Sequence, residues 1–201
     1  MSELGTSRWV AVDLEATCWA PDEDPALAAD QWNECETIEI GAVRIDPVDR
    51  TMGDAFRAVI RPRRHPRLSA FCTRLTGLEQ AEVDAAPPFP EVYAAFLDWL
   101  GGDANLTLAS WGAWDDRQLR RDAARWDLEE PRWKGCNVKR LFARSTRGTR
   151  APRGGWMGLG AAVAHLGGTF LGTPHRALDD ARNVAWILSR LDAGAVAPSL
   201  R

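Results

Sequence analysis

Long apolar runs are missing from this sequence, because Arg, Asp or Gly interrupts each apolar stretch within a few residues. A membrane-spanning helix needs about 20 consecutive apolar residues, so we expect no membrane span and no membrane partner. The first residues also lack the basic start and the apolar stretch of a secretory signal. These absences predict a cytoplasmic protein.

Cysteines are few and scattered, and none stands in a CxxC pair or at metal-ligand spacing from a His. Such pairs are typical of zinc sites, so zinc binding is not expected. In a reducing compartment the expected state of a scattered cysteine is a free thiol. We therefore expect four free thiols, at Cys18, Cys35, Cys72 and Cys136.

Lysine is nearly absent, with 2 residues against 23 arginines, and the net charge is −3. Residues 1–100 hold 18 acidic and 9 basic side chains, whereas residues 101–201 hold 10 and 16. The basic loop 144–155, with Lys139 and Arg140, lies in a stretch without Asp or Glu. This asymmetry fits a polyanion-binding surface beside an acidic, cation-binding site. For the chain the alternative is an uneven scatter of solvated charges. For the loop, which is a candidate track for upstream phosphates, the alternative is a mobile, solvated loop.

The chain has 201 residues, enough for one α/β domain, and we expect a single domain over 1–201 with its core at about 8–192. Alternating apolar and polar residues predict strands, and apolar residues three to four apart predict helices. Three antiparallel strands followed by alternating helices and strands indicate a mixed sheet flanked by helices. We expect strands at 8–14, 37–46, 56–61, 106–111 and 135–138, helices at 91–100, 115–126, 158–166 and 177–191, and a loop at 21–30.

Asp13 and Glu15 stand two residues apart at the end of the first expected strand, in VAVDLEA. Alternation along a strand puts both carboxylates on one face of the sheet. The apolar neighbours predict burial of Asp13, which is costly for an unpaired carboxylate. A hard cation such as Mg²⁺ or Mn²⁺ would offset that cost. A polar residue placed where a strand leaves the core is the alternative explanation.

Two further acidic positions stand at the start of expected helices. Asp115 begins a helix in SWGAWDDRQL, where helix capping by Asp115 or Asp116 explains the acids equally well. Asp180, in HRALDDARN, heads the apolar stripe of the last helix and should point to the core, whereas Asp179 should be solvated. His175 precedes this helix and is a cap, a surface residue or a base, since an imidazole can take a proton near neutral pH.

Four carboxylates and a His from three separated segments are what two cations about 4 Å apart would require. The stretches VDLEATC, NECETIEIGAV, FCTRLTGL, ASWGAWDDRQL, NVKRLF and HRALDDARN occur in the order and rough spacing of the DEDDh 3′–5′ exonucleases. Over residues 8–192 the sequence resembles this family, and most closely its branch of histone-mRNA and RNA-interference 3′ exonucleases. It is more distantly similar to RNase T and to the proofreading subunit of bacterial DNA polymerase III. The resemblance implies an RNase H-like fold with a five-stranded mixed sheet.

The resemblance also implies a hydrolase that releases nucleoside 5′-monophosphates from 3′ ends of single-stranded RNA or DNA. The branch that the sequence most resembles slightly favours RNA over DNA as the expected substrate. In that family pattern His175 is the general base on the attacking water. The family's W-G-x-aromatic-D pattern selects Asp115 over Asp116. The four acids of the pattern would bind two Mg²⁺ or Mn²⁺ ions, with the first acid bridging: Asp13, Glu15, Asp115 and Asp180.

By the same resemblance, Ala16 and Thr17 approach the terminal nucleotide. Phe71, Leu75 and Trp114 line the pocket of its base, where stacking tolerates any base. For these apolar side chains ordinary core packing is the alternative.

Two other functions stay open at this point. A catalytically silent nucleic-acid-binding module on the same fold would have little need of clustered acids, and release of mononucleotides with Mg²⁺ would exclude it. An oligoribonuclease-like or structure-dependent nuclease would use the same chemistry, and a circular or 3′-blocked substrate would distinguish it. Because RNA is told from DNA by contacts to the 2′-hydroxyl, and no residue identifies such contacts, the sugar preference does not follow from the residues.

Overall fold

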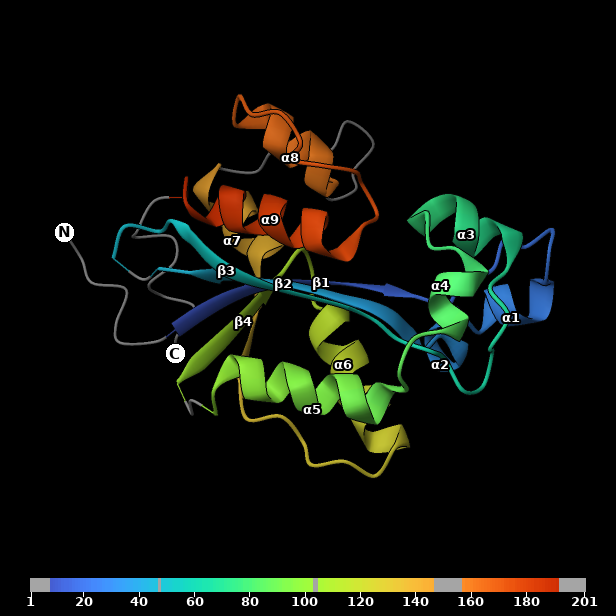
Figure 1. Ribbon diagram of the computed structural model, residues 1–201. Helices are drawn as coiled ribbons and strands as arrows, with labels where there is room; N and C mark the ends of the chain where they lie inside the picture. The colour runs from blue at the N-terminus through green and yellow to red at the C-terminus, as the bar shows by residue number, and fades with distance from the viewer. Residues whose placement is uncertain (1–7, 47, 103–104, 147–156, 192–201) are drawn as a thin grey trace.

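The computed structural model describes residues 8–46, 48–102, 105–146 and 157–191. A five-stranded sheet lies between two layers of helices (Figure 1). The first three strands form an antiparallel meander, and the last two run parallel to the first. This is the predicted mixed sheet flanked by helices. The strands are β1 (Arg8–Ala16), β2 (Thr37–Ile45), β3 (Met52–Val59), β4 (Leu106–Ser110) and β5 (Lys134–Asn137), in the order β3-β2-β1-β4-β5.

The helices fall into three groups, which Figure 1 separates clearly. One face of the sheet is covered by α5 (Phe89–Leu100) and α6 (Trp114–Arg125). The other face is covered by α7 (Val138–Ser145), α8 (Leu159–His165) and α9 (Ala177–Leu188). Four short helices lie together at one end of the sheet, namely α1 (Pro25–Ala29), α2 (Gln31–Glu34), α3 (Ala70–Thr76) and α4 (Gln80–Asp84).

Alternation along β1 divides the core into two layers. Val10, Val12 and Leu14 pack with residues of α5 and α6. Trp9 and Ala11 pack on the opposite face with residues of α7, α8 and α9. Because side chains two apart share a face of a strand, the odd-numbered positions that follow in β1 also face α9. The sheet thus carries the first two candidate acids toward the last helix.

The short helices were not predicted, and the loop expected at 21–30 contains α1. They are too short for a periodic apolar pattern and depend on local hydrogen bonds instead. The Asp24 carboxylate accepts from two backbone N–H groups at the start of α1, and the Ser69 hydroxyl accepts from Cys72 N at 2.9 Å at the start of α3. The third strand spans Met52–Val59 rather than 56–61, because β2 pairs with it back to Met52.

The four cysteines are free thiols, as predicted. No helix in the described part of the chain has the length and apolar character needed to cross a membrane. The expected core ended at residue 192, which lies outside the described residues, as do residues 147–156 of the basic stretch. The single-domain assignment over the whole chain stays a prediction.

Candidate active site

The predicted acids come from three elements that meet at one end of the sheet. Asp13 and Glu15 lie on β1, Asp115 on the first turn of α6 and Asp180 on the first turn of α9. One oxygen of the Asp115 carboxylate accepts a hydrogen bond from Leu14 N, between the two acids of β1, at 3.2 Å. Residues about a hundred positions apart in the chain are thereby held side by side.

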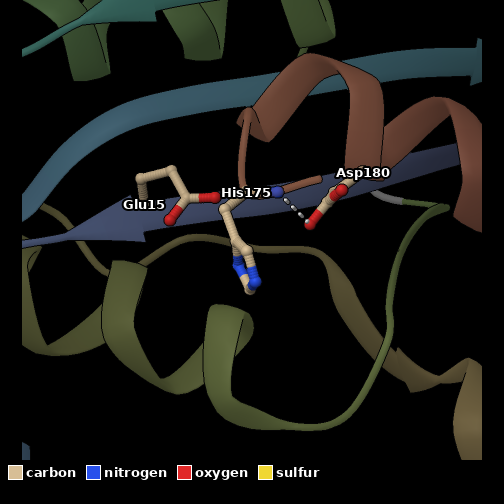
Figure 2. Close-up of side chains that lie close together, drawn as sticks. All are labelled: Glu15, His175 and Asp180. Atoms are coloured by element: carbon tan, nitrogen blue, oxygen red, sulfur yellow. Dashed lines mark hydrogen bonds between the residues drawn. The ribbon is translucent and has the colours of Figure 1, made fainter. Parts of the chain in front are cut away.

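Glu15, His175 and Asp180 form the tightest group of the site. One ligand atom from each residue lies within 4.8 Å of the others. Figure 2 shows His175 between the two carboxylates in this view, with its backbone N–H donating to Asp180 Oδ2 at 3.3 Å. The His175 side chain is exposed, and its φ of 62° is an uncommon backbone conformation for a residue with a Cβ. The backbone of His175 is therefore held by Asp180, and its imidazole is accessible to water.

The carboxylates of this cluster hold their protons unusually tightly. Burial, followed by the charges of Asp180 and other acids, raises the pKa of Glu15 to about 9. Burial also raises the pKa of Asp180 to about 7 and that of Asp115 to about 6. For Asp13 the pKa is raised well above its usual value, first by burial and then by Asp115, Asp180 and Glu15. Such mutual repulsion requires that all four groups lie close together.

The donor set fits a hard divalent cation. Asp180 Oδ1 is buried and has no hydrogen-bond partner among the described residues, which is unusual for a buried polar atom. The neighbouring donors are carboxylate oxygens, the ligands that Mg²⁺ and Mn²⁺ prefer. A cation would satisfy the unpaired oxygen and offset the repulsion between the acids. The geometry therefore supports a divalent metal site built from these residues.

Close packing of α9 on the sheet brings Asp180 to this position. Gly41 of β2 pairs with Asp13 of β1 across the sheet, on the face that α9 covers. A Cβ at Gly41 would overlap the backbone of Ala177, the first residue of α9. The absent side chain lets the start of the helix lie directly on the strand. Sequence analysis did not single out Gly41, although an isolated Gly within a strand pattern was a usable signal.

A second missed residue, Glu39, holds the start of α9. It lies opposite Glu15 in the sheet and is fully buried. Its carboxylate accepts from Ala177 N at 3.0 Å and from the side chain of Arg176 at 3.1 Å, and it forms an ion pair with Arg57 at 2.6 Å. Arg176 directly follows His175, so these contacts hold the loop that carries the imidazole.

Polar side chains of α9 also bind the loop that precedes the helix. The Asn183 side-chain amide accepts from Leu171 N at 3.0 Å and donates to Leu171 O at 2.9 Å. Asp179 accepts from Thr173 N at 2.9 Å and pairs with Arg182 at 3.0 Å. The expectation that Asp179 is solvated is therefore wrong, because its side chain is only 21% exposed and is used within the loop.

The residues expected near the terminal base lie at the same end of the sheet. Phe71 and Leu75 are one turn apart on α3, and both are half-buried. Helix α3 contacts the end of β1, where Cys72 Sγ donates to Ala16 O at 3.6 Å. Trp114 is half-buried and packs against the cluster that contains Ala16. Their role toward a base stays a prediction.

Thr17 is buried and forms more hydrogen bonds within the fold than expected. Its hydroxyl accepts from Glu36 N at 3.0 Å, its own backbone N–H donates to Glu36 O at 2.9 Å, and its side chain is buried. Its backbone carbonyl also accepts from Gln31 Nε2 at 2.9 Å, so both backbone groups of this residue are paired within the fold. A contact of Thr17 with a nucleotide stays a prediction.

Comparisons with known proteins agree with this geometry. The RNase T family, described as Exonuclease, matches residues 10–188. The 3′-5′ exonuclease Snipper of Drosophila melanogaster is 30% identical over 202 residues, covering 90% of this chain and 68% of that protein. ERI1 exoribonuclease 2 of Danio rerio is 29% identical over 211 residues, covering 90% of this chain and 34% of that protein. The chain thus spans about a third of the second relative's length.

A solved structure has the same fold. It is the nuclease domain of 3′hExo, a DEDDh family member, bound to rAMP. The TM-score is 0.79 at 28% identity, and the match covers 94% of this chain and 93% of that one. Together with the strand order, this similarity confirms the predicted RNase H-like fold.

Proposed function

The chain belongs to the RNase T family of exonucleases as a 3′–5′ exonuclease of the DEDDh type, and we propose that it releases nucleoside 5′-monophosphates from the 3′ end of single-stranded RNA and, more slowly, of single-stranded DNA. One observation carries this proposal. Four carboxylates with raised pKa values and an exposed imidazole meet at one end of the sheet. Ordinary packing does not require such a costly cluster.

In this proposal Asp13, Glu15, Asp115 and Asp180 hold two divalent ions, Mg²⁺ or Mn²⁺. The bound ions supply positive charge that offsets the charge developing on the phosphodiester. The carboxylates orient the reacting groups beside the exposed imidazole. The buried, unpartnered Asp180 Oδ1 supports this assignment.

His175 is the proposed general base. Its side chain is exposed, whereas the acids beside it are buried or partly buried, so it is the member of the group that a water molecule reaches most easily. An imidazole can accept a proton from the attacking water at neutral pH. The Asp180 contact to the His175 backbone and the Glu39 contacts to Arg176 and Ala177 hold this residue while the proton moves.

The preference for RNA rests on the relatives. A relative from Danio rerio is named an exoribonuclease, and the nuclease domain of similar fold binds rAMP. Phe71, Leu75 and Trp114 are proposed to line the pocket of the terminal base, which they would contact by stacking and apolar packing. Such contacts do not read base identity, so we expect weak sequence preference.

The proposal is tested with 5′-labelled RNA and DNA single strands of the same sequence, incubated with the enzyme and Mn²⁺ or Mg²⁺. The expected result is a ladder that shortens from the 3′ end, faster for RNA, and that EDTA abolishes. A circular strand of the same composition should stay intact. Cleavage of the circle, or shortening from the 5′ end, would overturn the proposal.

The His175→Ala variant tests the base, with Arg190→Ala as the matched control. Arg190 lies after the last turn of α9 and stacks on Trp186. Removing a general base is expected to lower kcat by about 10²–10⁴-fold, with little change in thermal stability because His175 is exposed. Unchanged kcat in His175→Ala would remove the assigned base and leave the metal site untouched.

A further inference from the structure

A cavity lies beside the acid cluster, where β4 and β5 end and α6 and α7 begin. Its volume is about 370 Å³, within the range of about 300–1,000 Å³ typical of small-ligand sites. Its lining residues include Ser110, Asp116, Gly135, Asn137, Arg140 and Arg144. The two arginines among them supply the positive charge of the cavity.

Arg140 and Arg144 stand on the same side of α7. They are four residues apart, so one helical turn of about 6 Å separates them along the axis. Both side chains are exposed. Neither guanidinium has an ion-pair or hydrogen-bond partner in the described part of the chain. The backbone N–H of Arg140 donates to Asn137 Oδ1 at 3.1 Å, at the start of α7. Both guanidinium groups are free to bind an anion.

Among the described residues of the cavity wall, Asp116 is the carboxylate, and it is paired with Arg120, which also contacts Glu130. Asp116 Oδ1 accepts from Arg120 at 3.1 Å and from Trp133 Nε1 at 2.7 Å. Gly135 keeps the space in front of it open, because a Cβ there would lie 2.7 Å from Asp116 Oδ2. The cavity therefore presents two unpaired cations and one compensated anion, which favours a ligand with more than one negative charge.

The cavity is joined to the acid cluster through the segment between β4 and α6. The Ser110 hydroxyl lines the cavity and donates to Gly112 O at 3.3 Å, within this segment. Gly112 and Ala113 also line the cavity and directly precede the first turn of α6. A strand that enters the acid cluster can thus continue across this segment into the cavity.

We infer that this cavity binds the phosphodiesters that lie upstream of the scissile one, with Arg140 and Arg144 each contacting a phosphate. The inference rests on the proposed function, since it assigns the path of the same substrate strand. A guanidinium matches the geometry of phosphate oxygens. Phosphate contacts fix the position of a strand without reading its bases, which suits an enzyme that must advance along any sequence.

The test compares substrates with and without upstream phosphates. An eight-residue oligouridylate has upstream phosphates, whereas the p-nitrophenyl ester of thymidine 5′-monophosphate has none. In the Arg140→Ala/Arg144→Ala variant the KM for the octamer should rise by about 100-fold, about tenfold per charged contact. This rise is the fold-change in KM for the octamer divided by the fold-change in KM for the ester. The salt dependence of octamer binding should flatten by about 1.4 in the log–log slope.

Two further variants act as controls. Arg132→Ala removes an arginine that is 81% exposed, lies outside the cavity and pairs with Glu129. This variant should keep the wild-type ratio of the KM for the octamer to the KM for the ester. Arg140→Lys/Arg144→Lys keeps both charges and should recover most of the octamer affinity. It also keeps the inference testable if the alanine variant folds poorly.

The outcomes are distinct. Equal losses on the octamer and the ester, or unchanged octamer KM, would overturn the inference while wild-type hydrolysis still upheld the proposed function. If the alanine variant weakened only the inhibition by free AMP, the cavity would bind a free nucleotide, and the inference would again fail. A wild-type enzyme inactive on both substrates with Mn²⁺ would refute the proposed function itself.

Discussion

Replacing Asp180 by Asn should stabilise the metal-free protein at alkaline pH and remove part of its pH dependence. The Asp180 carboxyl is 9% exposed, and burial raises its pKa from 3.8 to about 7. A raised folded-state pKa means that the folded protein binds the proton more tightly than the unfolded chain. The resulting stabilisation is complete below the unfolded pKa and is lost as the pH rises through about 7.

The magnitude follows from the size of the shift. About three pKa units at 1.36 kcal/mol per unit correspond to at most about 4 kcal/mol. Between pH 5 and pH 8 the wild-type protein in EDTA should lose about 2.6 kcal/mol of unfolding free energy through Asp180 alone. The asparagine side chain of the variant carries no charge and can still accept the hydrogen bond from His175 N through its amide oxygen. The Asp180→Asn variant should therefore lose about 2.6 kcal/mol less over this range.

The assay is urea unfolding at pH 5 and pH 8, in EDTA and in saturating Mn²⁺. Mn²⁺ should remove most of the wild-type pH dependence, because the ion takes the place of the protons and stabilises by about 2.7 kcal/mol at 100 times its Kd. Asp179→Asn is the matched control, since Asp179 belongs to the same turn but binds Thr173 N and Arg182. That variant removes a charge that contributes to the raised pKa of Asp180 but keeps the Asp180 carboxylate, so most of the wild-type pH dependence should stay.

Either of two results would refute this reasoning. A metal-free wild-type protein whose stability is flat or rises from pH 5 to pH 8 would mean that the carboxylates do not repel one another in the folded state. An Asp180→Asn variant with the same pH dependence as the wild type, and the same response to Mn²⁺, would show that Asp180 lies outside the ion site.

Three more predictions concern the residues that build the site. Gly41→Ala should displace the start of α9 and abolish Mn²⁺-dependent activity. Gly53→Ala on β3, where a Cβ would have only ordinary contacts, should be tolerated. Thermal melts and nuclease assays of both variants check this, and an active Gly41→Ala enzyme would contradict it. Glu39→Gln removes the buried charge that Arg57 and Arg176 share, although both arginines keep the exposed Glu82 as a partner. It should cost about 1.5–3 kcal/mol of unfolding free energy, measured by urea unfolding, and an unchanged stability would argue against it. Phe71→Ala should raise the KM for oligonucleotides by about tenfold, because base stacking contributes about 1–3 kcal/mol per base. It should have little effect on stability, because Phe71 is only half-buried. An unchanged KM would assign Phe71 to packing alone.

Local periodicity explains which parts of the fold followed from the sequence. The alternation in β1 puts Asp13 and Glu15 on one face, because successive side chains of any strand point to opposite faces. The apolar stripe of α9 turns Asp180 inward by the same kind of argument. The short helices α1 to α4 did not follow, because segments of four to seven residues have no periodic signal and are held by caps and by contacts with the rest of the chain.

The sequence by itself determined the types of the chemical groups and the faces on which they stand, since both depend on residues within a few positions of one another. Only the tertiary structure decided that the groups meet. The parallel pairing of β1 with β4 brings the start of α6 to Leu14, and the bare backbone at Gly41 lets α9 lie on the sheet. Contacts between residues a hundred positions apart depend on strand order and close packing, which no local pattern encodes.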